Sequence, residues 1–238
     1  MLRFIFKDKE EKGEKKEIRT FWIYAVGEFV LVFLGILIAL QVDNWNQDRR
    51  VRNLEKAMLH ELLANLYSDL DDVETNIGMH NEAISSSKII LSFIDGAEPW
   101  NDSLAIHFGN LNIGSIFFEN ISSYESLKSL GIDLISNDSL RQQITHLYSV
   151  SYDYIASLEE LSLKHTFEIL NVSVAKLLYM TAPMHTYVPL DVSEMRASNE
   201  FRHNLMLYLS FNSYQLNTYS KAKDELLSLI DAIEKEIS

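Results

Sequence analysis

The chain is poor in the residues that cross-link or bend a protein: its 238 residues include no cysteine, three prolines and eight glycines. Without thiols it can form neither a disulfide-stapled secreted domain nor a cysteine-ligated zinc or iron–sulfur centre. Few prolines and glycines leave few sharp turns, which predicts a helical protein. Basic side chains are also in the minority, 21 against 34 acidic ones, for a net charge of −13. Because this acidic excess repels phosphate, we expect no nucleic acid partner.

Charge divides the chain into three segments. Residues 1–20 carry seven basic and five acidic side chains, and residues 21–42 carry only Glu28. Residues 43–238 carry 14 basic and 28 acidic side chains, so the negative charge is concentrated there. We therefore predict a basic-rich head, an apolar segment and an acidic domain.

The apolar segment, FWIYAVGEFVLVFLGILIALQV at residues 21–42, has the length of a membrane-spanning helix. Crossing about 30 Å of hydrocarbon takes roughly 20 apolar residues. Trp22 and Trp45 lie about 34 Å apart along a helix, which places an indole at each interface of the lipid bilayer. A buried core helix and a secretory signal peptide are the alternatives. The long run without a polar face and the lack of a small-x-small cleavage site favour an uncleaved anchor.

Basic residues near the span predict its orientation, because cytoplasmic flanks carry more lysine and arginine. Seven lie in the head, and the comparable stretch after the span has four, which are Arg49, Arg50, Arg52 and Lys56. We therefore expect residues 1–20 to be cytoplasmic and residues 43–238 to be extracytoplasmic. The arginine cluster after the span works against this orientation.

Glu28 stands inside the apolar segment, where charged side chains usually face protein or water. At about 100° per residue, Tyr24, Glu28, Gly35 and Ala39 fall on one stripe of the helix. Gly35 and Ala39 form a pair of small residues that lets two helices approach closely. We predict a homo-oligomer that associates through this face, with the carboxyl hydrogen-bonding across the interface. The alternatives are that Glu28 reaches the headgroups, or that it handles protons as in ion-driven stator subunits.

The sequence GEFVLVFLGILIALQ at residues 27–41, followed by DNWN at 43–46 and by Arg49, resembles a family signature. The family is an uncharacterised group of single-span membrane proteins of Gram-negative bacteria, classed as a domain of unknown function. A weaker similarity covers residues 124–148, and Asp43 stands where the family usually has asparagine. The resemblance implies a protein of the bacterial inner membrane with one N-terminal span, and with the predicted orientation the acidic domain is periplasmic. It implies no activity, substrate or catalytic residue.

The acidic domain shows the apolar periodicity of long helices. Residues 95–99 form a turn cluster, Asn137 is placed to cap a helix, and Pro183 is placed to end one. The expected elements are a helix from the span to residue 95, short helices at 104–110 and 122–131, a long helix from 138 to 182 and a last helix at 195–236.

The apolar stripes of these helices predict how they pack. The stripe of the second long helix is Leu140, Ile144, Leu147, Tyr154, Leu158, Leu161, Val172 and Tyr179. We expect an all-α fold in which the transmembrane helix is followed by a long-helix antiparallel bundle with a small irregular subdomain. The alternative is an extended coiled coil that packs only on oligomerisation.

Motifs that carry chemistry are not found in the sequence. The seven histidines include no H-E-x-x-H, and the single E-x-x-H, Glu200 to His203, lacks the second copy that a di-iron bundle requires. No phosphate-binding glycine loop, nucleophile elbow or kinase set is present. We therefore expect no enzyme activity, metal or cofactor.

Polar residues on the apolar stripes are the remaining site candidates. Suppose that the second long helix starts at the level of residue 94 and runs antiparallel to the first, and that the last helix runs parallel to the first. His165, Glu168 and Asn212 then come to the level of residues 67–68 of the first helix. A buried hydrogen-bonded cluster that fixes the helix register is one interpretation, and a small-ligand pocket is the other.

These features favour a membrane-anchored helical interaction or scaffold protein that associates with itself and with a membrane or periplasmic protein partner. The alternative is a ligand-sensing helical bundle that signals through a separate partner. An enzyme ranks third, for want of a nucleophile–base pair or a set of metal ligands.

Overall fold

The computed structural model describes residues 2–97, 99–112, 114–182 and 186–238, with side chains from residue 22 onward except those of residues 23, 25 and 112. The chain is mostly helical, as expected, and divides into two compact units, residues 1–54 and 55–238. The helices are α1 (Leu2–Ile94), α2 (Leu104–Gly109), η1 (Asn110–Asn112), α3 (Ser122–Leu130), η2 (Ile132–Leu134), α4 (Asp138–His146), η3 (Leu147–Ser151), α5 (Tyr152–His165), η4 (Thr166–Leu170), α6 (Asn171–Leu177), α7 (Val192–Ala197) and α8 (Asn199–Ile237).

The first unit consists of the N-terminal part of α1. Every described side chain from residue 26 to residue 54 is exposed, although the run up to residue 42 is almost wholly apolar. By length and composition this helix is a candidate membrane span. The side chains of the basic-rich head, residues 1–20, lie outside the described ones. Within the unit, an α-helix satisfies its own backbone hydrogen bonds, which is the condition for entering hydrocarbon.

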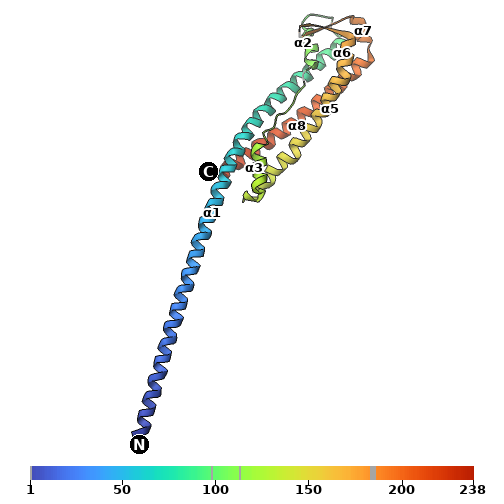
Figure 1. Ribbon diagram of the computed structural model, residues 1–238. Coiled ribbons are helices and arrows are strands. Elements are labelled where there is room, and N and C mark those ends of the chain that lie inside the picture. Colours follow the sequence, from blue (N-terminus) through green and yellow to red (C-terminus); the bar gives the residue numbers. More distant parts are fainter. Residues whose placement is uncertain (1, 98, 113, 183–185) are drawn as a thin grey trace. The chain divides into compact units, whose positions relative to one another are not determined.

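The second unit is built from the C-terminal part of α1, the helical run from α4 to α6, and α8 (Figure 1). Near one end of the unit, the Glu55 carboxylate of α1 accepts a hydrogen bond from the N–H of Ser136, which precedes α4. Near the other end, Asp95 accepts a hydrogen bond from Arg202 of α8. The run from α4 to α6 therefore points in the same direction as α1, and α8 points in the opposite one. We had expected the second long helix to descend, so this direction corrects the predicted packing.

A non-helical segment, residues 114–121, explains the direction of the second long helix. It lies along α1 and runs antiparallel to it. Asn76 of α1 donates a hydrogen bond to the Ile116 carbonyl, whereas Asn65, earlier on α1, donates one to the hydroxyl of Ser123, just after the segment. We call residues 114–121 the strap. Because the strap returns the chain to the level of residue 65 of α1, the second long helix begins near that level and runs parallel to α1.

The apolar core forms two clusters along the second unit. One joins the residue 58–73 stretch of α1 to α3, α4, α5 and the C-terminal half of α8, and it includes Leu66, Leu127 and Leu226. The other joins the end of α1 to α2, α6 and the start of α8, where Phe93 and Phe108 meet edge to face at 6.2 Å. Polar side chains lie between the two clusters.

The second long helix contains π-helical segments at η3 and η4. A π-helical turn takes in one residue more than an α-helical turn, so each segment shifts the buried stripe along the sequence. Predicted stripe residues Tyr154, Leu161 and Val172 are consequently exposed, and Tyr179 is exposed because it lies in a strand and not in the helix. Their neighbours Ile155 and Ser162 are buried instead, as are Ser173 and Leu178. The α-helical period predicted the stripe correctly up to Leu147 and failed after it.

The region after α6 differs from the expected helix. Strands β1 (Leu178–Ala182) and β2 (Thr186–Pro189) form an antiparallel hairpin. Residues 178–182 and 186–189 are rich in tyrosine, threonine and valine, which favour strands over helices. Pro183, where we expected the helix to end, lies outside the described residues. The last helix is also divided, because the Ser198 hydroxyl accepts a hydrogen bond from the Phe201 N–H and begins α8 anew.

The short elements follow their sequence signals. The Asn137 side chain accepts hydrogen bonds from the N–H groups of Ser139 and Leu140 and caps α4. Gly131 ends α3 with a φ of 104°, a backbone conformation that favours glycine.

Candidate functional site

The predicted association face lies on the first unit. Tyr24, Glu28, Gly35 and Ala39 are all exposed and share one stripe of a continuous helix. A Cβ added to Gly35 would meet nothing within 4 Å. In a single copy the helix backbone at Gly35 is therefore open to close approach by another helix.

Three carboxylates of the second unit hold the strap, and two of them, Asp69 and Glu159, are buried while Asp72 is half-buried. Strap N–H groups donate to them: Asn120 to Asp69 at 2.8 Å, Phe118 to Asp72 at 3.1 Å and Phe117 to Glu159 at 2.9 Å. Extended backbone that is buried against a helix needs such acceptors, because it has no strand to pair with. The acidic residues at these positions therefore have a structural role that their number in the sequence did not reveal.

Tyrosines complete the pairing of two of these acids. The Tyr152 hydroxyl donates to Asp69 at 2.8 Å, and the Tyr219 hydroxyl donates to Glu159. Burial raises the pKa of the Asp69 and Glu159 carboxyls, and the hydrogen bonds that they accept oppose this rise. Removing the acceptors would leave buried N–H and O–H groups unpaired, which costs more than the hydrogen bonds themselves stabilise.

A polar layer separates the two apolar clusters. His80 of α1 and Asn212 of α8 are joined by a 2.9 Å hydrogen bond between Nδ1 and Oδ1. Nearby on α1, Asn76 accepts a hydrogen bond of 2.5 Å from the Ser115 hydroxyl. We define the polar layer as the buried residues Asn76, His80, Ser115, Ser162, His165, Asn212 and Gln215.

The structure distributes the predicted polar cluster differently from the expectation. His165 and Asn212 are buried, at 5% and 4% exposure, but Glu168 is exposed because it lies within the π-helical segment η4. Asn212 bonds His80, so its level along α1 is that of residue 80 and not of residues 67–68. The ring of His165 lies 5.4 Å from that of Phe211, the neighbour of Asn212. Among the described residues, neither ring nitrogen of His165 has a hydrogen-bond partner.

The buried histidines are poor proton acceptors. Burial lowers the pKa of His80, while its hydrogen bond to Asn212 opposes the change. Burial also lowers the pKa of His165, and the neighbouring His203 adds to that effect. Both rings are therefore held neutral in the folded chain near pH 7.

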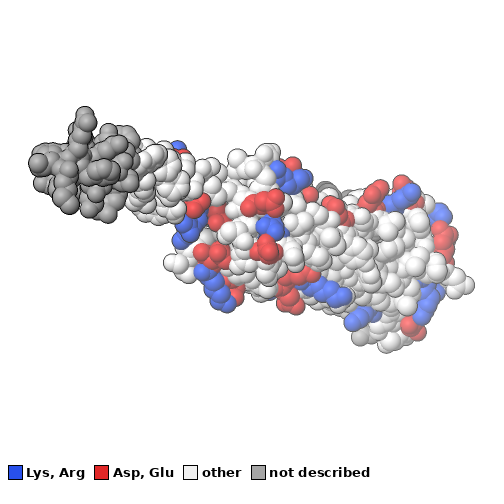
Figure 2. Space-filling view, turned by 90° about the horizontal axis from the view of Figure 1, so that it is seen from below, with Lys and Arg blue, Asp and Glu red and all other residues white. Residues whose placement is uncertain are grey.

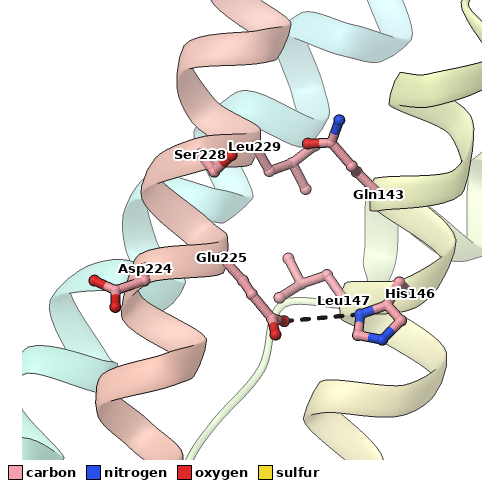
Figure 3. Close-up of a pocket in the computed structure, with 7 residues that line it drawn as sticks. All are labelled: Gln143, His146, Leu147, Asp224, Glu225, Ser228 and Leu229. Atoms are coloured by element: carbon pink, nitrogen blue, oxygen red, sulfur yellow. Dashed lines mark ion pairs between the residues drawn. The ribbon is translucent and has the colours of Figure 1, made fainter.

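A groove of about 410 Å³ lies between α4, η3 and α8. In Figure 3, Glu225 from α8 points toward His146 from α4, and the two side chains form an ion pair of 3.8 Å when the imidazole is charged. The groove is lined by Gln143, His146, Leu147, Asp224, Glu225, Ser228 and Leu229. Its acidic side chains favour a cationic ligand.

Ser151 lies beside this groove and contacts its histidine and glutamate, but the three residues do not form a hydrolase triad. The Ser151 hydroxyl donates to Glu225 at 2.5 Å and lies 3.5 Å from His146 Nδ1, the same ring nitrogen that faces Glu225. In a triad the nucleophile and the acid contact opposite nitrogens of the ring, so that the proton can pass through the base. The arrangement therefore suits binding rather than acyl transfer.

Sequence reasoning missed both the groove and the strap contacts, because their residues come from segments far apart in the chain. One signal was available for the strap. Asp69 occupies a position on the apolar stripe of α1, between Leu66 and Val73, where an acid requires a buried partner. Within the part of the chain that the structure describes, no group of three histidines or acids is placed to hold a metal ion.

Comparison with known proteins identifies a family. A family of unknown function, DUF6090, matches residues 28–185, well over half of the chain. The chain therefore belongs to this family. No curated protein and no solved structure matches it.

Proposed function

We propose that this member of the DUF6090 family is a membrane-anchored interaction or scaffold protein that associates with itself through its apolar helix. In this proposal the protein is single-pass in a bacterial inner membrane, with residues 1–20 cytoplasmic. In the same proposal the second unit is a long-helix bundle in the periplasm and presents its surface to a membrane or periplasmic protein partner.

One observation carries the proposal: the first unit exposes a continuous apolar surface. Side chains such as Phe29, Leu31 and Ile38 are more than 60% exposed. Soluble monomers rarely expose contiguous apolar patches of more than a few hundred Å², because apolar surface in water is unfavourable. In Figure 2 the described helix next to the grey residues is mostly white, whereas acidic and basic residues are interspersed over the second unit. A lipid bilayer would cover the first surface and leave the second in water.

The face of Glu28 and Gly35 supports self-association within that bilayer. The open backbone at Gly35 allows close packing of a second helix, which is the main source of helix association in lipid. A carboxyl in hydrocarbon is costly, and a hydrogen bond to the same group of a second copy lowers that cost.

Crosslinking with mass measurement tests this proposal on the full chain in membranes. Gly35→Leu places a large side chain on the face, and we expect it to reduce the crosslinked oligomer severalfold relative to wild type. Gly27→Leu is the matched control, since Gly27 lies about a quarter turn from the centre of the face. An oligomer that is unchanged by Gly35→Leu would remove the argument for this face.

The second candidate function is ligand sensing, favoured by the acidic groove at Glu225 and by the polar layer with its unpartnered His165. It becomes the better proposal if Gly35→Leu leaves the oligomer intact while a polyamine raises the melting temperature of wild type but not of Glu225→Gln.

A further inference from the structure

A cluster of arginines follows the apolar segment and has no role in the proposed function. Arg49, Arg50 and Arg52 belong to the first unit and are exposed. Among the described residues, none of them forms an ion pair with an acidic side chain. Their guanidinium groups are therefore available to an anion from outside the chain.

Helix geometry places two of these arginines on one face with a tryptophan. Trp45, Arg49 and Arg52 are spaced by four and three residues, so they lie within about 60° of one another around the helix. Arg50 lies to one side of them. We call Trp45, Arg49 and Arg52 the arginine face.

The distance along the helix brings this face to the lipid headgroups. The apolar run ends at Val42, and Trp45 follows after about 4.5 Å, the depth at which interfacial tryptophans sit. Arg49 and Arg52 follow at about 10 and 15 Å, while the headgroup layer extends roughly 5 to 8 Å beyond the hydrocarbon. Arginine side chains turn back toward the interface in such positions, so their guanidinium groups reach the lipid phosphates.

The chemistry of arginine selects the ligand. A guanidinium binds two phosphate oxygens at once, and it is less strongly hydrated than an ammonium group. We propose that the arginine face binds the phosphate groups of anionic lipids, of the phosphatidylglycerol type, in the leaflet next to the second unit. This inference rests on the membrane anchor of the proposed function, and it holds for either orientation of the chain.

The expected selectivity follows from the number of charges. Each arginine near an anionic surface contributes roughly a fivefold preference, so Arg49 and Arg52 together predict a preference of roughly 25-fold. Salt screens this attraction, because the Debye length shortens to about 4 to 5 Å at 0.5 M. The preference should therefore fall at high salt.

Native mass spectrometry of the full chain tests the inference. The protein, purified in detergent, is exposed to equal amounts of phosphatidylglycerol and phosphatidylethanolamine, and the lipids that remain bound are counted. We expect wild type to retain mainly phosphatidylglycerol and the double variant Arg49→Gln/Arg52→Gln to lose most of that preference. Lys164→Gln/Lys221→Gln is the control. It removes the same charge from exposed positions of the second unit and should behave as wild type.

The possible outcomes separate this inference from the proposed function. No lipid preference in wild type, or an equal loss of preference in the control variant, overturns the inference. Carbonate extraction of membranes that contain the same proteins reports on the anchor itself. A chain that is extracted overturns both proposals, whereas a retained chain with a Gly35-dependent oligomer and no lipid preference overturns only the arginine face.

Discussion

The two units place carboxyl groups among apolar residues in opposite ways. In the second unit, Asp69 and Glu159 are buried, and backbone N–H and tyrosine O–H groups of the same chain donate to them. In the first unit, Glu28 stands on an exposed apolar helix, and no hydrogen bond from the described residues to its carboxyl is found. The buried carboxylates of the second unit therefore have partners within that unit, whereas under the proposed function the partner of Glu28 comes from a second copy of the chain or from the lipid headgroups.

The largest expected effect concerns the side of the membrane on which the residues before and after the apolar segment lie, because labelling of each side is expected to be all or none. The chain lacks cysteine, so single substitutions give labelling sites without background. With a membrane-impermeant maleimide on cells whose outer membrane has been opened, we expect Glu160→Cys to be labelled and Thr20→Cys to be protected. Both variants should label after detergent lysis, which serves as the control. Labelling of Thr20→Cys but not of Glu160→Cys in these cells before lysis would reverse the orientation.

The next largest effect concerns the buried acid Asp69. Asp69→Ala leaves the Asn120 N–H and the Tyr152 hydroxyl without their acceptor, and we expect a loss of about 3 kcal/mol in the free energy of unfolding. Asp69→Asn keeps an acceptor oxygen and removes a charge whose burial is unfavourable, so we expect a loss below about 1 kcal/mol. Urea denaturation measures both.

Asp71→Ala is the matched control for this pair, because Asp71 is exposed on the same helix. We expect its effect to be within about 0.5 kcal/mol. If Asp69→Asn proved as damaging as Asp69→Ala, the negative charge itself would be stabilising, and the comparison with Glu28 would no longer hold.

The sequence predicted most of the helices of this fold, because capping and apolar periodicity act locally. It indicated the apolar segment, the cap at Asn137 and the short helix near residues 122–131. It did not predict the π-helical segments, since an added residue in a helical turn leaves no local signal, and Tyr154, Leu161 and Val172 were therefore assigned to the stripe in place of the residues that follow them. The same shift turned Glu168 outward and removed it from the candidate cluster. The strap contacts were missed because they join residues about 40 to 50 positions apart.

The smallest effect concerns the polar layer and its dependence on pH. Burial lowers the pKa of His165 below that of an unfolded histidine, so the unfolded chain takes up a proton first as the pH falls. The stability contributed by the neutral ring is therefore present above pH 6.5 and is lost below it, by at most about 1.4 kcal/mol per pH unit for each histidine. His80 acts in the same direction, whereas the raised pKa values of Asp69 and Glu159 make the fold more stable on acidification.

Comparison of wild type with His165→Phe cancels the contribution of those other groups. Phenylalanine fills a similar volume beside Phe211 and has no ring nitrogen to leave unpaired, so we expect stability at pH 7.5 to be equal or slightly higher. Between pH 6.5 and 5 the variant should lose less stability than wild type, by about 1 kcal/mol. Urea denaturation across this range measures the difference. Equal slopes for the two proteins would mean that His165 takes up a proton as readily in the folded chain as in the unfolded one, and burial would then not keep the ring neutral.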